Sequence, residues 1–413
     1  MKTRRLVLVC AIIAAFAVGA FAEPLNGRKI VLQAGEIKSV NPIVVLPCDA
    51  PETEAVVRVF QESTAKTFPA TLRNGELVFI PEGAMPGAEL VFTVKVEPKT
   101  EGYAPRVLVR KVDDAKILEV LIDDVHFTSY HYSEEYKKPF LWPVKAEGGV
   151  HITRDFPMET ESTPRFARDH PHHKSLWTAY GEVNSVDLWA EGGNSGVQKS
   201  GEPTWGSGDA YGWISVTNTW QDKDGNPLIT EAREYRFYAT PEKARMLDAR
   251  ITFTADYGEV IFSDTKEGGI MAVRMTPTIS GEGAVITNAH GDEGEGQCWG
   301  KPSPWCDYSG EIANMGWRGL TIFDHPTNLR HPTSWHVRSY GLMGANCFGW
   351  SYFAEKDYNK GLFPAERGDY TFAPGESLTF NYRVYVHSGD VKAAAVADRY
   401  ADYATPPAVR WAE

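Results

Sequence analysis

The sequence predicts an all-β chain. Short runs rich in Val, Ile, Tyr, Phe and Thr recur from Lys29 to Val386, and turn-forming Gly, Pro, Asn and acidic residues separate them. A content of 43% hydrophobic and 12% aromatic residues supplies a large core and excludes a disordered chain. Helical periodicity is convincing only in Asp390–Ala404, where Asp390 could cap the start.

Two folded units are expected, because 413 residues exceed the usual size of one domain. The strands within residues 23–110 have the spacing of a small immunoglobulin-like β-sandwich. The polar stretch "PKTEGYAP" at 98–105 connects them to the rest of the chain. We therefore place a boundary near residue 110 and assign 111–413 to a large sandwich of two extended sheets.

Residues 1–22 predict a secretory signal peptide. A basic start precedes an apolar stretch that ends in the small-x-small tripeptide Ala20-Phe21-Ala22. Export to the periplasm or the medium is the expectation, and no later stretch is long and apolar enough to cross a bilayer. Removing the signal takes three of the 42 basic residues and none of the 54 acidic ones, which leaves a net charge of −15. Such an acidic chain is a poor partner for nucleic acid.

The cysteines leave two alternatives open. In an oxidising compartment Cys298 and Cys306 could close a short disulfide loop, or they could be buried free thiols. The sequence carries no signal for the oligomeric state.

The stretch "RDHPHHKSLW" at 168–177 places three histidines within four residues. A metal needs three or four convergent ligands, but in an extended chain His170 and His172 share a face that His173 opposes. Neither HExxH nor paired CxxC motifs accompany them. We predict no metal and no cofactor, and interpret the cluster as an acid/base or sugar-binding group.

A second constellation lies in "SWHVRSYGL" at 334–342. If this stretch is a strand, its period of two places His336, Arg338 and Tyr340 on one face. An unpaired buried guanidinium is very costly, so this row is better suited to the floor of a site than to ordinary core. We expect it to face the same site as at least one histidine of 170–173.

Two further strands carry charge. In "EAREYRF" Glu231 and Arg233 are two residues apart, which favours a structural ion pair. In "SDTKEGGIMAVRM" Glu267 stands beside Lys266 at the start of an apolar strand that contains Arg274. A carboxylate held near these cations stays ionised and could act as a base or bind hydroxyls, the alternative being a solvated turn.

Aromatic residues stand beside carboxylates in two loop-rich stretches. One holds Asp187 and Trp189, and the other holds Trp305 and Asp307. A sugar ring offers flat C–H surfaces to aromatic faces and hydroxyls to carboxylates. These pairs therefore predict the rims of a sugar-binding cleft, although some tryptophans must be core.

These motifs together resemble a family of exported bacterial proteins labelled methane oxygenase PmoA-like. The resemblance rests on stretches such as "DHPHHKSLW", "GEVNSVDLW", "WGKPSPWCDYSG" and "DHPTNLRHPTSWHVRSYGL", in order from about residue 140 to 390. It implies a galactose-mutarotase-like β-supersandwich for the large unit and a role in bacterial sugar degradation. The family label also suggests a metal-dependent oxygenase, which we keep as a minor alternative.

The resulting hypothesis is an enzyme that acts on a glycoside or keto-sugar by proton transfer, as hydrolase, lyase or epimerase. His336 and one of His172 and His173 are the expected acid and base, with Glu267 as a second candidate base. Arg338 and Arg274 would polarise a carbonyl or hold a carboxylate. The remaining expected carbohydrate contacts are Asp187, Trp189, Trp305, Asp307, Asn328, Tyr340 and Asn346. A non-catalytic sugar-binding or surface-assembly protein is the alternative.

Overall fold

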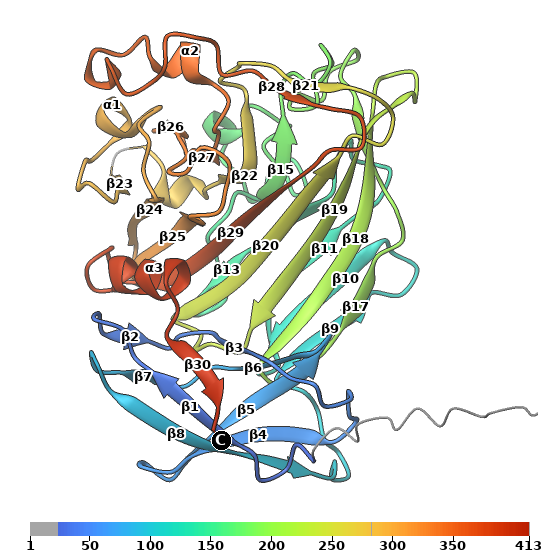
Figure 1. Cartoon of the computed structure of the whole chain (residues 1–413). Helices are drawn as coiled ribbons and strands as arrows, with labels where there is room; N and C mark the ends of the chain where they lie inside the picture. Colours follow the sequence, from blue (N-terminus) through green and yellow to red (C-terminus); the bar gives the residue numbers. More distant parts are fainter. Residues whose placement is uncertain (1–23, 282, 413) are drawn as a thin grey trace, which may run out of the picture.

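The computed structural model describes residues 24–281 and 283–412 (Figure 1). The chain is nearly all β, with 46% strand and 7% helix, so the predicted fold class is confirmed. The predicted signal peptide lies outside the described residues. None of the helices in the described part is both long and apolar enough to span a membrane.

The N-terminal unit is one seven-stranded sheet around its own core. The strands at its two ends, β3 and β30, contact each other, so the sheet curls around that core. Residues 39–40 (β2) and 83–84 (β7) form a small additional pair. The order of the sheet is β3 (Val44–Pro47), β6 (Glu76–Phe79), β5 (Lys66–Arg73), β4 (Val56–Gln61), β8 (Glu89–Glu97), β1 (Lys29–Gln33) and β30 (Ala408–Trp411).

Strand β30 corrects the expectation that 111–413 forms one unit. The chain leaves the large unit after its last helix and pairs β30 antiparallel with β1, joining Ile30 to Trp411 in register. The chain passes from one unit to the other between the end of β8 and the start of the next strand at Val107. Both ends of the large unit are therefore tied to the N-terminal sheet, which lies below it in Figure 1.

The large unit consists of two extended sheets that enclose one apolar core. The eight-stranded sheet has the order β26 (Trp335–Arg338), β27 (Leu342–Ala345), β22 (Gly268–Arg274), β15 (Leu176–Tyr180), β12 (Phe140–Leu141), β11 (Val125–His131), β10 (Ile117–Ile122) and β9 (Val107–Lys111). The nine-stranded sheet has the order β16 (Val197–Ser200), β18 (Tyr211–Gln221), β19 (Pro227–Tyr238), β20 (Ala244–Thr254), β29 (Ser377–Ser388), β25 (Gly316–Asp324), β24 (Trp305–Ile312) and β23 (Ala284–Asn288), with β17 (Thr204–Gly206) paired to β18.

Short elements complete the large unit. The two-stranded pairs are β13 (Lys145–Ala146) with β14 (Val150–His151) and β21 (Val260–Phe262) with β28 (Tyr370–Phe372). The helices are α1 (Glu295–Cys298), α2 (Trp350–Phe353) and α3 (Val396–Ala404), and the 3-10 turns are η1 (Arg165–Ala167), η2 (Pro277–Ile279) and η3 (Asp357–Asn359). Helix α3 begins six residues later than expected, because Asp390 accepts hydrogen bonds from the backbone of Lys392 and Ala393 in a preceding turn.

A charged pair is buried in the core between the sheets. The Nε and Nη2 atoms of Arg233 donate to the Glu231 carboxylate over 2.5 and 2.9 Å, and neither side chain is exposed. Trp220 Nε1 donates to the same carboxylate over 2.6 Å. Burial alone would lower the pKa of Arg233, but Glu231 outweighs it and raises that pKa. The predicted structural ion pair is thus confirmed.

The described cysteines, Cys48, Cys298, Cys306 and Cys347, are all buried free thiols. Cys298 lies near the backbone oxygen of Asp292, at 3.3 Å. Cys298 and Cys306 are therefore buried free thiols in this structure and not the disulfide that the sequence also allowed.

Candidate functional site

The candidate site lies on the outer face of the eight-stranded sheet, opposite the main core. Trp335 and Val337 of β26 point into the core, so the pleat directs His336 to the outer face. The residues paired with His336 on successive strands form a row across β27, β22, β15, β12 and β11. In order from His336, they are Gly344, Ala272, Trp177, Phe140 and His131.

The loop that carries the histidine cluster packs over this row. Arg154, which has no exposed surface, holds the loop by donating to the backbone oxygens of Ala167, Asp169, His170 and His173 over 2.8 to 3.1 Å. His170 has a φ of 42°, a left-handed conformation that residues other than glycine seldom adopt. The buried arginine therefore fixes a strained turn, and such strain is often stored at functional sites.

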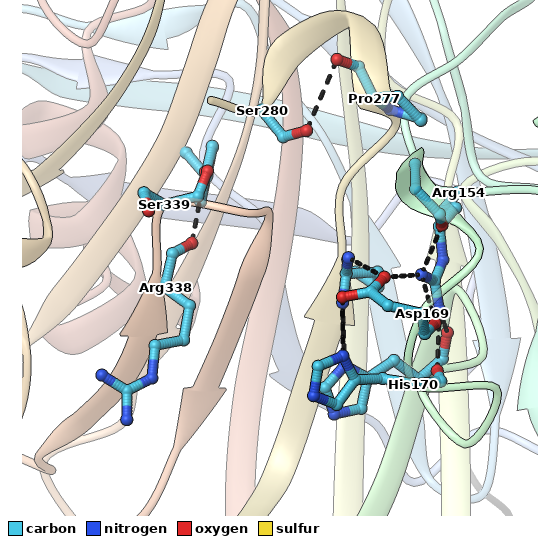
Figure 2. Close-up of polar contacts among 11 residues, drawn as sticks. Arg154, Asp169, His170, Pro277, Ser280, Arg338 and Ser339 are labelled. Atoms are coloured by element: carbon cyan, nitrogen blue, oxygen red, sulfur yellow. Dashed lines mark hydrogen bonds and ion pairs between the residues drawn. The ribbon is translucent and has the colours of Figure 1, made fainter. Parts of the chain in front are cut away.

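Asp169 connects the loop to the sheet (Figure 2). Its Oδ1 atom accepts from Arg154 Nη1 over 2.8 Å and from Arg274 Nη2 over 2.6 Å. Its Oδ2 atom lies 2.6 Å from Nδ1 of His170. Burial alone would raise the pKa of Asp169, but Arg274, His170 and Arg154 outweigh it and hold that pKa below its usual range. The carboxylate is therefore ionised at neutral pH.

These contacts define the protonation of two imidazoles. Because Asp169 is an acceptor, His170 carries a proton on Nδ1, and its Nε2 lone pair is available when the ring is neutral. Arg274 Nη1 lies 3.1 Å from Nδ1 of His173, and a guanidinium can only donate, so His173 carries its proton on Nε2. The His170 side chain is 42% exposed, whereas His173 is buried. His170 is therefore the imidazole of this pair that a substrate can reach.

The three histidines expected as acid and base are uncharged at neutral pH. Burial, reinforced by Lys138, lowers the pKa of His172 to about 3. Burial, reinforced by Arg338, lowers the pKa of His336 to about 3. Burial also lowers the pKa of His173 well below its usual value. These three imidazoles are neutral because a buried imidazolium would lose its hydration without a carboxylate partner, so their role as acid and base stays a prediction.

Tyr340, which follows the strand that carries His336 and Arg338, packs against the loop that carries His170 and His173. It lies in the turn after β26, and its ring stacks on His170 and His173 with centroids 5.2 and 6.4 Å apart. The Arg274 guanidinium lies 4.4 Å from the centre of the same ring. Burial raises the pKa of the Tyr340 hydroxyl, which therefore remains a proton donor. His336 approaches the cluster through Trp189, whose ring centroid is 6.4 Å from His336 and 6.2 Å from His172.

Two partly exposed ion pairs border the cluster. Arg338 donates to Glu295 over 2.8 Å, and the other oxygen of Glu295 accepts from the backbone of Ser339. Lys266 donates to Glu267 over 2.6 Å. The charges of Arg338 and Glu267 both act on the Tyr340 hydroxyl, so both pairs lie within electrostatic reach of it.

Beneath His172 lies a third set of charges that sequence reasoning did not find. Lys138 and Lys174 are both buried and both pair with Glu191, Lys138 over 3.0 Å. Burial lowers the pKa of Lys138 to about 8. Two cations on one carboxylate give this end of the site a local excess of positive charge.

Several expected carbohydrate contacts are structural instead. Trp305 packs with Phe323 and Tyr385 on the outer face of the other sheet. Asp307, fully buried, accepts from Thr321 and pairs with His387 over 2.7 Å. These two residues therefore lie outside the candidate site.

The two asparagines and Asp187 act on the backbone. Asn328 donates to Asp324 and to the backbone oxygen of Asn381, both over 2.7 Å. Asn346 bonds the backbone of residues 265, 348 and 349. Asp187 accepts from the backbone of Trp189 and Ala190 over 2.9 Å. Trp189 itself is 2% exposed, so it cannot stack on a sugar in this structure.

Among residues 24–281 and 283–412, no three His, Cys, Asp or Glu side chains converge as metal ligands. Sequence reasoning missed Asp169 and His170 as an acting pair and Arg154 as their support. The adjacency of an aspartate and a histidine before proline was the one available signal for the pair. The sequence offers no comparable signal for Arg154, because Arg154 contacts residues 167–173 only in the folded structure.

Comparisons with known proteins correct the family expectation. The profile of a family of unknown function, DUF6807, matches residues 117–401. The resemblance to a PmoA-like family is therefore wrong, and the oxygenase alternative, which rested on that label, loses its basis. No match was found among curated proteins. A solved structure, the galactosidase domain of alpha-galactosidase-sucrose kinase AgaSK, aligns with a TM-score of 0.36 and 8% identity over 69% of this chain and 42% of that chain. A likeness this weak carries no argument about function.

Proposed function

We propose that this chain, which belongs to the family of unknown function DUF6807, is an exported carbohydrate-active enzyme that transfers protons through His170. The observation that carries the proposal is the Asp169–His170 pair. Its carboxylate is clamped by two buried arginines, and its imidazole is exposed in a strained turn. Export is proposed from residues 1–22 alone.

The pair has the parts of a general base. The Nε2 lone pair of His170 can accept a proton, and the ionised Asp169 stabilises the imidazolium that forms. Arg154 and Arg274 keep Asp169 from accepting that proton itself, because they lower its pKa. The proton therefore remains on His170 until it is returned to product or solvent.

A carbonyl-bearing sugar fits the groups around this base. His170 would take the proton from the carbon next to the carbonyl, and the electron pair would move to the carbonyl oxygen, where Arg338 stabilises the negative charge. This enolate either expels a neighbouring oxygen substituent, which takes the proton from His170, or accepts a proton from solvent on its other face while His170 returns its own proton to solvent. The products are those of a lyase or an epimerase, respectively.

The carbohydrate class is inferred from the surroundings of the base. Tyr340 offers a partly exposed aromatic ring and a protonated hydroxyl beside His170. Glu267 offers a partly exposed carboxylate that can bind sugar hydroxyls. The neutral imidazoles of His172, His173 and His336 form a polar floor instead of acting as acids.

Product formation is the test. Purified protein is incubated with a panel of glycosides, 3-keto-glycosides and uronates, and products are identified by mass spectrometry in deuterated water. The proposal expects a new product that carries deuterium at the carbon next to a carbonyl, or an unsaturated product. Saturable sugar binding with no turnover across the panel would favour the non-catalytic binding protein instead.

A further inference from the structure

A cavity of about 330 Å³ lies between the N-terminal unit and the large unit, on the nine-stranded sheet. The histidine cluster lies instead on the outer face of the eight-stranded sheet, which we call the histidine face. The floor of the cavity lies on the nine-stranded sheet, where β19 contributes alternate residues from Glu234 to Tyr238 and β20 and β29 contribute residues 248–250 and 381–383. One wall comes from β3 and β6 of the N-terminal sheet, and the other comes from α3 and the segment after it. Figure 1 shows α3 at this junction, where the chain turns back toward β30.

Most of the charged groups of the cavity are paired with one another. Arg383 makes two parallel hydrogen bonds to Asp248, over 2.6 and 2.9 Å, and Tyr238 donates to the same carboxylate over 2.8 Å. Arg236 donates to Glu234 over 2.6 Å and to Glu76 over 2.9 Å. Because Glu76 belongs to the N-terminal sheet, the Arg236–Glu76 pair connects the two units. The lining thus presents fixed donors and acceptors with little net charge.

Apolar and aromatic surface lies beside these pairs. Val45 of β3 is 38% exposed and stands at the wall of the cavity. Tyr403 of α3, which is 9% exposed, has the Arg383 guanidinium 4.5 Å from the centre of its ring, and its ring centroid lies 5.0 Å from that of His325 in an edge-to-face arrangement. Arg250 is exposed on the floor, in register with Glu234 and Asn381.

We propose that this cavity is a binding site for a neutral saccharide unit, separate from the histidine face. A sugar ring needs apolar surface for its C–H groups and paired donors and acceptors for its hydroxyls, and the lining offers both. The volume falls at the lower end of the range for small-molecule pockets, about 300–1,000 Å³, which fits one or two sugar units.

Other ligand classes fit less well. An anion would meet Glu76, Glu234, Asp248 and Asp402, and two of the three facing arginines, Arg236 and Arg383, already hold carboxylates. A metal ion lacks a convergent ligand group anywhere in the described part of the chain. A purely apolar ligand would bury the charged floor without replacing its contacts with water.

Two variants separate this site from the histidine face. Val45→Trp places a large side chain at the cavity wall, and Val125→Trp is the matched control, because Val125 is 41% exposed at the start of β11 and does not line the cavity. Arg250→Ala removes an exposed donor as a second, milder change. Binding of glucose, galactose, mannose, cellobiose and lactose is followed by calorimetry in the full chain, with sulfate and galacturonate as anionic probes.

The proposal predicts saturable binding of at least one neutral sugar by the unmodified protein, by Val125→Trp and by His170→Gln. Arg250→Ala should weaken that binding about tenfold, and Val45→Trp should abolish it. Three results would overturn the proposal: none of the neutral sugars binds, only the anions bind, or Val45→Trp binds as the unmodified protein does. Failure of the enzyme proposal would appear separately as the absence of turnover.

Discussion

Nδ1 of His170 lies 2.6 Å from Oδ2 of Asp169, while the other oxygen of that carboxylate is held by Arg154 and Arg274. The arginines come from a loop and from β22, so the pair is fixed from two sides. This arrangement determines the position of His170 and which of its ring nitrogens faces Asp169. The predicted effects on activity depend on it.

Asp169→Asn should reduce turnover by about two orders of magnitude or more, because an amide does not stabilise the imidazolium and can favour the wrong tautomer. The matched control is Asp155→Asn, since Asp155 pairs with His151 over the same 2.6 Å. Steady-state kinetics on the substrate found by the panel, with circular dichroism to verify the fold, measures the effect. Equal losses in both variants would contradict a specific role for Asp169.

Glu231→Gln should destabilise the fold by about 3–5 kcal/mol, because it leaves Arg233 buried without its carboxylate. Glu119→Gln is the control, since Glu119 pairs with Arg110 at the surface and such pairs contribute about 0–1 kcal/mol. Urea unfolding monitored by tryptophan fluorescence gives both values. A loss below about 1 kcal/mol for Glu231→Gln would contradict the buried pair.

Strand periodicity predicted that His336 and Arg338 share a face, and the structure agrees, because Trp335 and Val337, which alternate with them, are core residues. It did not place Trp305 and Asp307, since both faces of β24 are buried and alternation no longer distinguishes inside from outside. The N-terminal unit and α3 cover that outer face, and no local pattern encodes this cover. Arg154 and Asp169 meet only through tertiary structure, so the sequence left the acting pair unseen.

The free energy of unfolding should fall as the pH drops from about 6.5, the ordinary pKa of histidine, toward 3. Burial lowers the pKa of His172 and of His336 to about 3 in the folded protein. A histidine whose pKa is lowered by folding binds its proton more readily in the unfolded chain, so acid favours unfolding across this window. His336→Gln should show a shallower fall than the unmodified protein, and the exposed His290→Gln should not. Unfolding midpoints at several pH values test this, and identical slopes in all three proteins would contradict it.

The thiols of Cys48, Cys298, Cys306 and Cys347 should react with a thiol reagent only after unfolding, because all four are buried and free. Burial raises the pKa of Cys298 to about 12, which further suppresses its reactivity. The measurement is thiol titration with and without denaturant on protein purified in the absence of reductant. Two missing thiols in denaturant would instead indicate a disulfide.

The most direct test of the proton-transfer account is the turnover of His170→Gln on the substrate identified by the panel. The glutamine retains a polar side chain at the exposed position but cannot take up the proton. We expect kcat to fall by about two to four orders of magnitude with the fold intact and with His290→Gln unaffected. Turnover of His170→Gln within a few-fold of the unmodified protein would contradict the account.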